Sequence, residues 1–331
     1  MRSFELSGNC EIKFIELPDP VPGPGEVVIK TAASAICGSE MGSYRNAGRK
    51  GGNQGHEAVG VVAALGPGVS QLKPGQRVGV SPVAGCGDPA CEICNAGRYT
   101  WCPNRKGYSS MHQEKFLAAA NACRPLPDDL PWDIAVLISG DGLGVPYHTS
   151  LKIPADTRTI AVFGAGPIGL GNILLQKYYH RTVIAVDVSP FRLEQARKLG
   201  ADHVFNPTEC DAVKEIIKVT NGGADVCIEA AGRPETALNC FDAVRTAGLV
   251  IFNGEQPEVA LSPSSHFIRR DIWAVGAWFY HFCEFDDMLK LWRDGLDVAS
   301  LISDHRKYAD APAAYRDFAA GKTAKVILEY D

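Results

Sequence analysis

One stretch, Thr159–Asp187, restricts the possible folds more than any other part of the 331-residue chain. It opens with a short apolar run of strand type, Thr159–Phe163, and continues with the glycine-rich sequence GAGPIG at Gly164–Gly169. A helical pattern follows, and then a second β-branched run, Thr182–Val186, that ends on Asp187. A strand, a tight turn, a helix and a strand with an acid at its end are typical of a dinucleotide-binding unit.

Each glycine of the turn has its own expected use. Gly164 permits the tight turn, Gly166 lets a pyrophosphate approach the backbone, and Gly169 lets helix and strand pack closely. Pro167 and Ile168 lie between the last two glycines, where the helix N-terminus presents free N–H groups and a partial positive charge to phosphates. The alternative is that the turn only connects a strand to a helix.

Asp187 indicates which dinucleotide to expect. A carboxylate about 20 residues after the turn accepts hydrogen bonds from the ribose hydroxyls and repels a 2′-phosphate. Arg192 follows five residues later, but no basic residue lies beside the acid. The sequence therefore favours NAD over NADP.

Charge and composition exclude several classes of protein. The formal net charge of −5 argues against a nucleic-acid or membrane-surface protein, which usually shows a basic face. No apolar run approaches the length of a membrane span, and the first residues show no signal-peptide core. Eleven cysteines, an odd number, then indicate a reducing, cytoplasmic setting in which clustered cysteines bind metal.

Two architectural patterns divide the chain. Up to about Asp129, short strand-like runs separated by turns predict an all-β, barrel-like lobe. From Thr159 onward strands alternate with helices, which predicts a doubly wound parallel sheet. The last predicted strand, Ala324–Glu329, is expected to return to the first lobe. The main elements expected before Thr159 are strands at Glu26–Thr31, Ala58–Leu65 and Arg77–Val80 and helices at Trp132–Ile138 and Leu143–Ser150.

A cysteine cluster predicts a structural zinc site. Four cysteines lie within seventeen residues of irregular, loop-like sequence: Cys86, Cys91, Cys94 and Cys102. Four thiolates bind zinc tetrahedrally and close the site to chemistry. The alternatives are buried free cysteines or a redox pair.

A second set of possible ligands is scattered along the chain. Cys37, His56, Glu57 and Asp141 are of the types that bind catalytic zinc, which takes three protein ligands and keeps one open position. Taken singly, Cys37 also fits a buried small residue and His56 a core histidine. The sequence by itself does not bring these residues together.

Several motifs in a fixed order make the chain resemble the zinc-containing medium-chain dehydrogenases, the superfamily of alcohol and polyol dehydrogenases. The resemblance covers nearly the whole length. The motifs that carry it are CGSE at Cys37, GHEAVG at Gly55, KPGQRV at Lys73, the four-cysteine loop, GDGLGVPYHTS at Gly140 and GAGPIG at Gly164.

The resemblance implies two domains and two zinc ions per subunit. A GroES-like β-barrel catalytic domain would comprise residues 1–147 and 285–331, with the structural zinc lobe at 81–110. A Rossmann NAD-binding domain would comprise residues 148–284, and the active site would lie in the cleft between the domains. The implied catalytic zinc ligands are Cys37, His56 and Asp141, with Glu57 as an adjacent or alternate ligand, and the implied structural ligands are Cys86, Cys91, Cys94 and Cys102.

Three features depart from the pattern of that family. Four residues separate Cys86 from Cys91, where the family usually has two. Gly42 occupies the place at which many members carry a proton-passing histidine, so another relay is expected, through Tyr44, His112 or the ribose and water. Glu40 stands where aspartate is common, and we expect it to orient His56.

The implied activity is the reversible oxidation of an alcohol by NAD, with Ser39 accepting the alcohol proton. Tyr44, Arg45 and His112 are candidate substrate contacts, and their polarity suggests a secondary alcohol of a polyol, sugar or cyclitol. Further pocket candidates are Gln113, Trp273, Trp278 and Tyr280. The alternatives are a simple-alcohol dehydrogenase, a zinc-free reductase and a non-catalytic NAD-binding protein. Relatives form homodimers or homotetramers, often through the strand that corresponds to Ile272–Ala277.

Overall fold

The computed structural model describes residues 1–331 and divides into two compact units. The first unit comprises residues 1–144, 281–293 and 302–331, and the second comprises residues 145–280 and 294–301. The sequence-based boundaries lie a few residues from these. The segment 294–301, expected in the first domain, belongs instead to the second unit.

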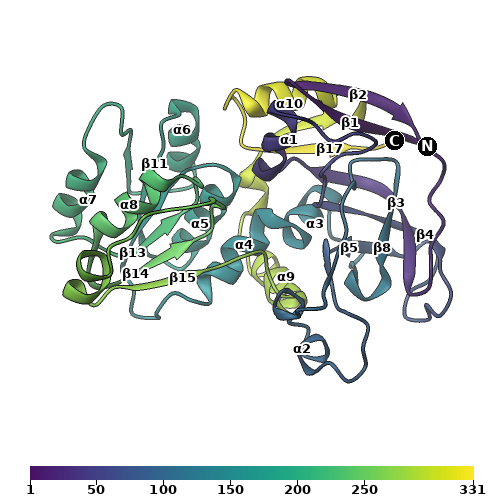
Figure 1. Ribbon diagram of the computed structural model, residues 1–331, viewed down its shortest axis with the longest axis horizontal. Coiled ribbons are helices and arrows are strands. Elements are labelled where there is room, and N and C mark those ends of the chain that lie inside the picture. Colours follow the sequence, from purple (N-terminus) through teal and green to yellow (C-terminus); the bar gives the residue numbers. More distant parts are fainter. The chain divides into compact units, whose positions relative to one another are not determined.

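A seven-stranded, mainly antiparallel sheet forms the centre of the first unit (Figure 1). The strand order is β16-β17-β3-β4-β5-β9, and β8 also pairs with β3. Val27, Ile29, Val62 and Phe116 are wholly or almost wholly buried in its core. This confirms the predicted β lobe. The strands are β3 (Glu26–Ala35), β4 (Ala58–Leu65), β5 (Arg77–Val80), β8 (Lys115–Ala119), β9 (Cys123–Pro125), β16 (Ile302–Lys307) and β17 (Lys325–Glu329).

The end of the chain completes this sheet, as predicted. Strand β17 pairs antiparallel with β3, and Leu328 lies opposite Ser34.

Two small sheets and several helices surround the larger sheet, and many of these were not predicted. The additional strands are β1 (Arg2–Gly8), β2 (Glu11–Glu16), β6 (Val83–Ala84) and β7 (Lys106–Gly107). The helices are α1 (Met41–Arg45), α2 (Glu92–Asn95), α3 (Trp132–Ser139), α9 (Phe285–Arg293) and α10 (Ala311–Ala319).

The second unit contains a parallel sheet in the order β12-β11-β10-β13-β14-β15. The central strands are buried along nearly their whole length, which explains why Thr159–Phe163 and Thr182–Val186 are continuous apolar runs. The doubly wound prediction is therefore confirmed. The strands are β10 (Thr159–Phe163), β11 (Thr182–Val186), β12 (His203–Phe205), β13 (Ala224–Glu229), β14 (Val244–Phe252) and β15 (Trp273–Gly276).

Helices connect and cover this parallel sheet (Figure 1). They are α5 (Pro167–Tyr178), α6 (Pro190–Lys198), α7 (Ala212–Thr220) and α8 (Pro234–Ala243), and α4 (Asp141–Ser150) precedes β10. A short 3-10 turn, Val298–Leu301, packs against α5 and buries Val298 and Leu301. This packing explains why 294–301 belongs to the second unit. None of the helices combines the length and apolar character that crossing a membrane requires.

Asp225 joins the starts of three strands of the parallel sheet. Its Oδ2 accepts hydrogen bonds from the backbone N–H groups of Arg158 (2.9 Å) and Thr159 (2.8 Å), and its Oδ1 accepts one from the Arg245 Nε (2.6 Å). Partial burial raises the pKa of Asp225, but these donors outweigh burial and lower the pKa to about 2. The carboxylate therefore stabilises the second unit only while it is ionised.

We expect Asp225→Asn to destabilise the second unit by ~1 kcal/mol at pH 7. The pKa of Asp225 is lower in the folded protein than its ordinary value of 3.8, so its contribution is complete above about pH 4 and is lost as the pH falls toward 2. Chemical unfolding of both proteins at pH 7 and at pH 3 measures the difference. A gap in unfolding free energy that stayed constant between these pH values would contradict this role.

Candidate active site and metal centres

The pairing of β3 with β4 brings Cys37 and His56 together. Ser34 near the end of β3 lies opposite Ala58 at the start of β4, and the Ala35 N–H donates to the Glu57 carbonyl (2.9 Å). Cys37 follows the end of β3 and His56 precedes the start of β4. Two residues distant in sequence therefore lie at the same end of the same strand pair.

Glu57 holds Asp141 close to Cys37 and His56. One carboxylate oxygen of Glu57, Oε2, accepts the backbone N–H of Asp141 (3.1 Å), the first residue of α4. An acid near a helix N-terminus satisfies a free N–H group and interacts favourably with the helix dipole. The other oxygen, Oε1, accepts the ammonium group of Lys325 on β17. Both oxygens of Glu57 are thus engaged, and its side chain is wholly buried.

The resulting group has the composition and spacing of a metal site. The ligand atoms of Cys37, His56, Glu57 and Asp141 all lie within 4.8 Å of one another. Asp141 Oδ2 is 3.3 Å from Cys37 Sγ and 3.0 Å from His56 Nε2. Tetrahedral zinc would place such atoms about 3.4–3.6 Å apart, so an ion needs only a few tenths of an ångström of outward adjustment. A thiolate, an imidazole and a carboxylate fit zinc and leave a fourth position open.

The electrostatics of this group favour a cation. Burial raises the pKa of the Cys37 thiol, and the Asp141 carboxylate raises it further. Burial lowers the pKa of His56, but Cys37 and Asp141 outweigh burial and raise it well above its ordinary value. The pKa of Asp141 is lowered because its contacts with His56 outweigh the opposing effect of burial. The Cys37 and Asp141 groups that favour a positive charge on His56 would also favour a divalent cation at the same place.

Lys325 is a residue that the sequence reasoning missed. Its side chain is almost fully buried, and Glu57 raises its pKa against the effect of burial. A buried ammonium needs a partner of opposite charge, which Glu57 provides. The available signal was the sequence itself, because Lys325 interrupts a run of apolar residues in a strand, Ala324–Leu328.

The predicted substrate contacts lie in different environments. Ser39 is exposed two residues after Cys37. Arg45 is also exposed, and its guanidinium donates to the Ala319 carbonyl (2.8 Å). Tyr44 and His112 are buried, which does not fit a substrate contact or a relay to solvent. Of the further candidates, Gln113 and Tyr280 are buried, whereas Trp273 and Trp278 are exposed.

Glu40 does not contact His56, contrary to the prediction. The His56 Nδ1 lies 2.9 Å from the Gln54 carbonyl oxygen, which fixes the orientation of the imidazole. The Glu40 carboxylate instead lies 3.1 Å from His112 Nε2. Burial raises the pKa of Glu40, but His112 outweighs burial and lowers the pKa to about 2, so the group is a carboxylate.

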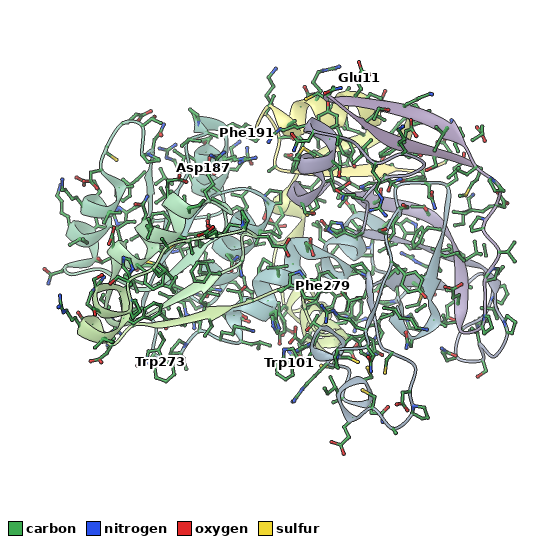
Figure 2. The ribbon with its side chains drawn as sticks, viewed as in Figure 1. Glu11, Trp101, Asp187, Phe191, Trp273 and Phe279 are labelled. Atoms are coloured by element: carbon green, nitrogen blue, oxygen red, sulfur yellow. The ribbon has the colours of Figure 1, made fainter.

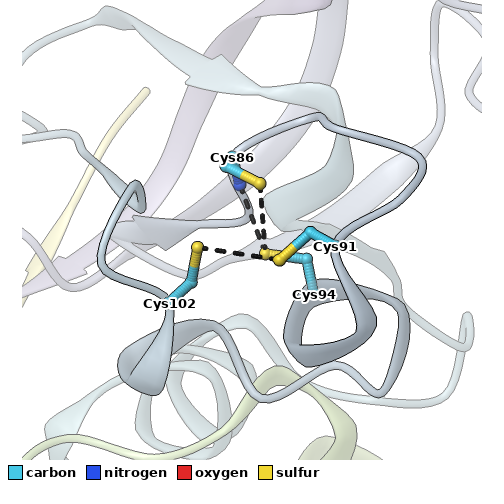
Figure 3. Close-up of side chains that lie close together, drawn as sticks. All are labelled: Cys86, Cys91, Cys94 and Cys102. Carbon is cyan, nitrogen blue, oxygen red and sulfur yellow. Dashed lines mark hydrogen bonds between the residues drawn. The ribbon is translucent and has the colours of Figure 1, made fainter.

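The four cysteines of the loop converge as zinc ligands would (Figure 3). The Sγ atoms of Cys86 and Cys94 are 3.6 Å apart, and those of Cys91 and Cys102 are 4.0 Å apart. Four sulfurs around a tetrahedral zinc would be about 3.8 Å apart. The longer gap between Cys86 and Cys91 therefore does not prevent closure, and none of the four forms a disulfide.

The glycine turn shows which of its glycines the protein itself requires. Gly164 has a φ of +95°, and a Cβ on Gly169 would lie 1.8 Å from the Gly164 carbonyl oxygen. These two positions are restricted by the fold. A Cβ on Gly166 would meet only the Arg192 guanidinium, at 4.0 Å. The space over Gly166, at the N-terminus of α5, fits an approaching pyrophosphate.

Asp187, which Figure 2 labels, lies next to this turn, and Arg192 lies beside Asp187. The Asp187 carboxylate accepts the N–H groups of Ala165 (2.7 Å) and Ser189 (2.8 Å) and is 3.9 Å from the Arg192 guanidinium. Each carboxylate oxygen keeps acceptor capacity for a ribose hydroxyl. The Arg192 Nε is buried without a hydrogen-bond partner, as expected for a group that contacts a bound dinucleotide.

Known proteins resemble the chain over nearly its whole length. A family profile described as an alcohol dehydrogenase GroES-like domain matches residues 23–128, and one described as a zinc-binding dehydrogenase matches residues 167–294. The sorbitol dehydrogenase of Bacillus subtilis is 35% identical, covering 79% of this chain and 78% of that protein. The L-threonine 3-dehydrogenase of Pyrococcus abyssi is 32% identical, covering 96% and 94%. The structure of alcohol dehydrogenase TADH from Thermus sp. ATN1 matches with a TM-score of 0.88 and 25% identity, covering all of both chains.

We expect Gly166→Ala and Gly169→Ala to fail in different ways. In Gly169→Ala the added methyl group collides with the backbone of the turn, so this variant should lose stability and lower the melting temperature. In Gly166→Ala the added methyl group meets only open space, so this variant should fold normally but bind dinucleotide ~10-fold or more weakly. Thermal melting and titration with NADH separate the two effects. Wild-type NADH affinity in a folded Gly166→Ala protein would contradict the assignment of the phosphate site.

Proposed function

Because the chain belongs to the family of zinc-dependent medium-chain dehydrogenases, we propose that it oxidises a secondary alcohol of a polyol, sugar or cyclitol to the ketone, with NAD as hydride acceptor. The family and the curated relatives make it a dehydrogenase that acts on CH–OH groups. The observation that supports the proposed chemistry most directly is the convergence of Cys37, His56 and Asp141 on one point within 4.8 Å.

We assign the steps on the protein side to a few residues. Cys37, His56 and Asp141 would hold a zinc ion, which when bound would supply a Lewis acid that makes the proton of an alcohol easier to remove. Ser39 is exposed near Cys37 and would accept that proton while passing its own hydroxyl proton on to water. Glu57 holds Asp141 through its backbone N–H, and Lys325 neutralises the charge of Glu57.

The substrate class is proposed from the relatives and from the exposed polar groups. The two relatives are named for sorbitol, which is a polyol, and for carbon 3 of L-threonine, which carries a secondary hydroxyl. In this chain Ser39 and Arg45 are the exposed candidates for hydrogen bonds to a hydroxyl-rich substrate. Tyr44 and His112, two of the predicted substrate contacts, are buried and therefore do not support this substrate class.

Asp187 supports NAD rather than NADP as the dinucleotide. Its carboxylate lies at the end of β11, 2.7 Å from the N–H of Ala165 in the glycine turn. A 2′-phosphate placed there would face a negative group, whereas ribose hydroxyls would find an acceptor. We therefore expect a lower KM for NAD than for NADP.

A turnover screen with zinc analysis on the same sample tests this function. The zinc-loaded protein should reduce NAD with sorbitol or a cyclitol faster than with ethanol or benzyl alcohol, and should hold about two zinc ions per chain. Cys37→Ser and His56→Ala should abolish turnover and lose about one zinc, yet bind NADH as the wild type does, because the dinucleotide turn lies elsewhere in the chain. A preference for simple primary alcohols would favour the predicted alternative, a simple-alcohol dehydrogenase. Wild-type rates in either variant would refute the metal assignment.

A homo-oligomer joined through β15 is also proposed. This strand is an edge of the parallel sheet, and Trp273 on it is 71% exposed and projects outward (Figure 2). An exposed edge strand with a large apolar side chain is a surface that pairs readily with another chain. Light scattering should give a multiple of the 35.5 kDa chain mass, and Trp273→Lys should lower it. A monomeric wild-type protein would exclude this arrangement.

A cytoplasmic location is the remaining part of the proposal. The structure leaves all eleven cysteines unpaired, and the four-cysteine site depends on thiolates that an oxidising compartment would convert to disulfides. Cell fractionation tests this location.

A further inference from the structure

A wholly buried histidine–carboxylate pair lies next to the candidate catalytic metal site. His112 and Glu40 both have 0% exposed surface. The His112 Nε2 is 3.1 Å from Glu40 Oε2 and 3.2 Å from Oε1, and the His112 Nδ1 is 2.7 Å from Ser34 Oγ. Neither side chain can reach a substrate or solvent. The proposed chemistry therefore gives this pair no direct role.

Glu40 ties this pair to the segment that carries Cys37. Its Oε1 accepts the backbone N–H of Cys37 (2.8 Å), and its Oε2 accepts the hydroxyl of Tyr315 (2.5 Å). The carboxylate thereby closes the turn Gly38–Glu40 back onto the residue before it. The direction in which Cys37 presents its sulfur thus depends on where Glu40 is held.

His112 ties the same pair to the segment that carries His56. A Cβ on Gly55 would lie 2.4 Å from His112 Cδ2, so the imidazole packs directly on the residue before His56. Asn53 Nδ2 donates to the His112 carbonyl (3.0 Å), and the Met111 N–H donates to the Gly55 carbonyl (3.0 Å). His112 thus contacts the segment Asn53–Gly55 in two ways: its backbone carbonyl binds Asn53, and its imidazole packs on Gly55 while contacting the Glu40 carboxylate that holds Cys37.

We propose that the His112–Glu40 pair is a positioning device, which holds the Cys37 and His56 segments at the spacing that the metal requires. This inference rests on the catalytic zinc site of the proposed function. A buried, hydrogen-bonded polar pair contributes little net stability compared with an apolar pair of similar volume. Its contribution is geometric, because it connects two segments that supply two of the three ligands.

Metal release measures this role without relying on activity. In His112→Phe the ring keeps a similar volume but loses both nitrogens. The zinc-loaded variant, mixed with excess chromogenic chelator, should release one zinc ~10-fold faster than the wild type, the size of effect typical of residues that orient metal ligands. Release from the four-cysteine site of the same chain should be unchanged, and it serves as an internal reference.

Two further variants separate positioning from general loosening. His112→Gln retains an N–H donor that can reach Glu40, so it should restore most of the slow release. Thr31→Val is the matched control, because Thr31 is buried and donates to the backbone carbonyl of Gln113, beside His112, without contacting Glu40. This control should lower the melting temperature without accelerating zinc release. Equal acceleration in His112→Phe and Thr31→Val would refute the proposal.

A cobalt-loaded protein gives an independent signature. Movement of the Cys37 sulfur alters the thiolate-to-cobalt absorption band, so His112→Phe should shift or weaken this band and Thr31→Val should not. If His112→Phe releases zinc at the wild-type rate and shows the wild-type thiolate-to-cobalt band, the inference is overturned. A wild-type protein that holds only the zinc of the four-cysteine site would instead overturn the proposed catalytic site. If His112→Phe does not fold, Glu40→Gln replaces it, and wild-type release from that variant overturns the inference equally.

Discussion

The pairing of β3 with β4 is the constraint on which the candidate active site depends. The register places Ser34 opposite Ala58, so the residues that follow one strand and precede the other must meet at one end of the sheet. Cys37 and His56 are those residues. Backbone hydrogen bonds along the strands determine this meeting, and the side chains only complete it. A shift of the register would separate the two ligands by the rise of the displaced residues, about 3.4 Å each.

Burial of charge determines how Asp141, the third proposed ligand, is held. Glu57 is buried between the Asp141 N–H and the Lys325 ammonium, so each of its oxygens has a partner. An unpaired carboxylate in this place would be costly, and so would an unpaired lysine. Because Lys325 lies on β17 and Asp141 begins α4, this ion pair joins the last strand of the chain to the helix that carries the ligand. The polar groups around the metal site are therefore also part of the structure of the first unit.

In the dinucleotide turn, contacts within the protein explain some of the glycines but not all of them. Two of its glycines are required by contacts within the protein, whereas Gly166 is surrounded by open space. The same distinction separates the two metal groups. The four cysteines lie on one loop and converge on one another, whereas Cys37, His56 and Asp141, the proposed catalytic ligands, come from separate elements and would leave a fourth position for a substrate. At the glycine turn and at the proposed catalytic metal site alike, the position proposed to bind a ligand is one that the protein's own side chains leave open.

The sequence alone determined the glycine turn, the parallel sheet and the four-cysteine cluster, because each depends on residues close in sequence or on a strong local pattern. The sequence did not predict that Lys325 pairs with Glu57, that Glu40 contacts His112 and not His56, or that Tyr44 is buried. It also missed β1, β2, β16 and α10, whose faces are partly exposed and whose patterns are weak. These outcomes belong to the tertiary structure, since a buried polar side chain takes the partner that packing brings within about 3 Å, and that partner can lie anywhere in the chain.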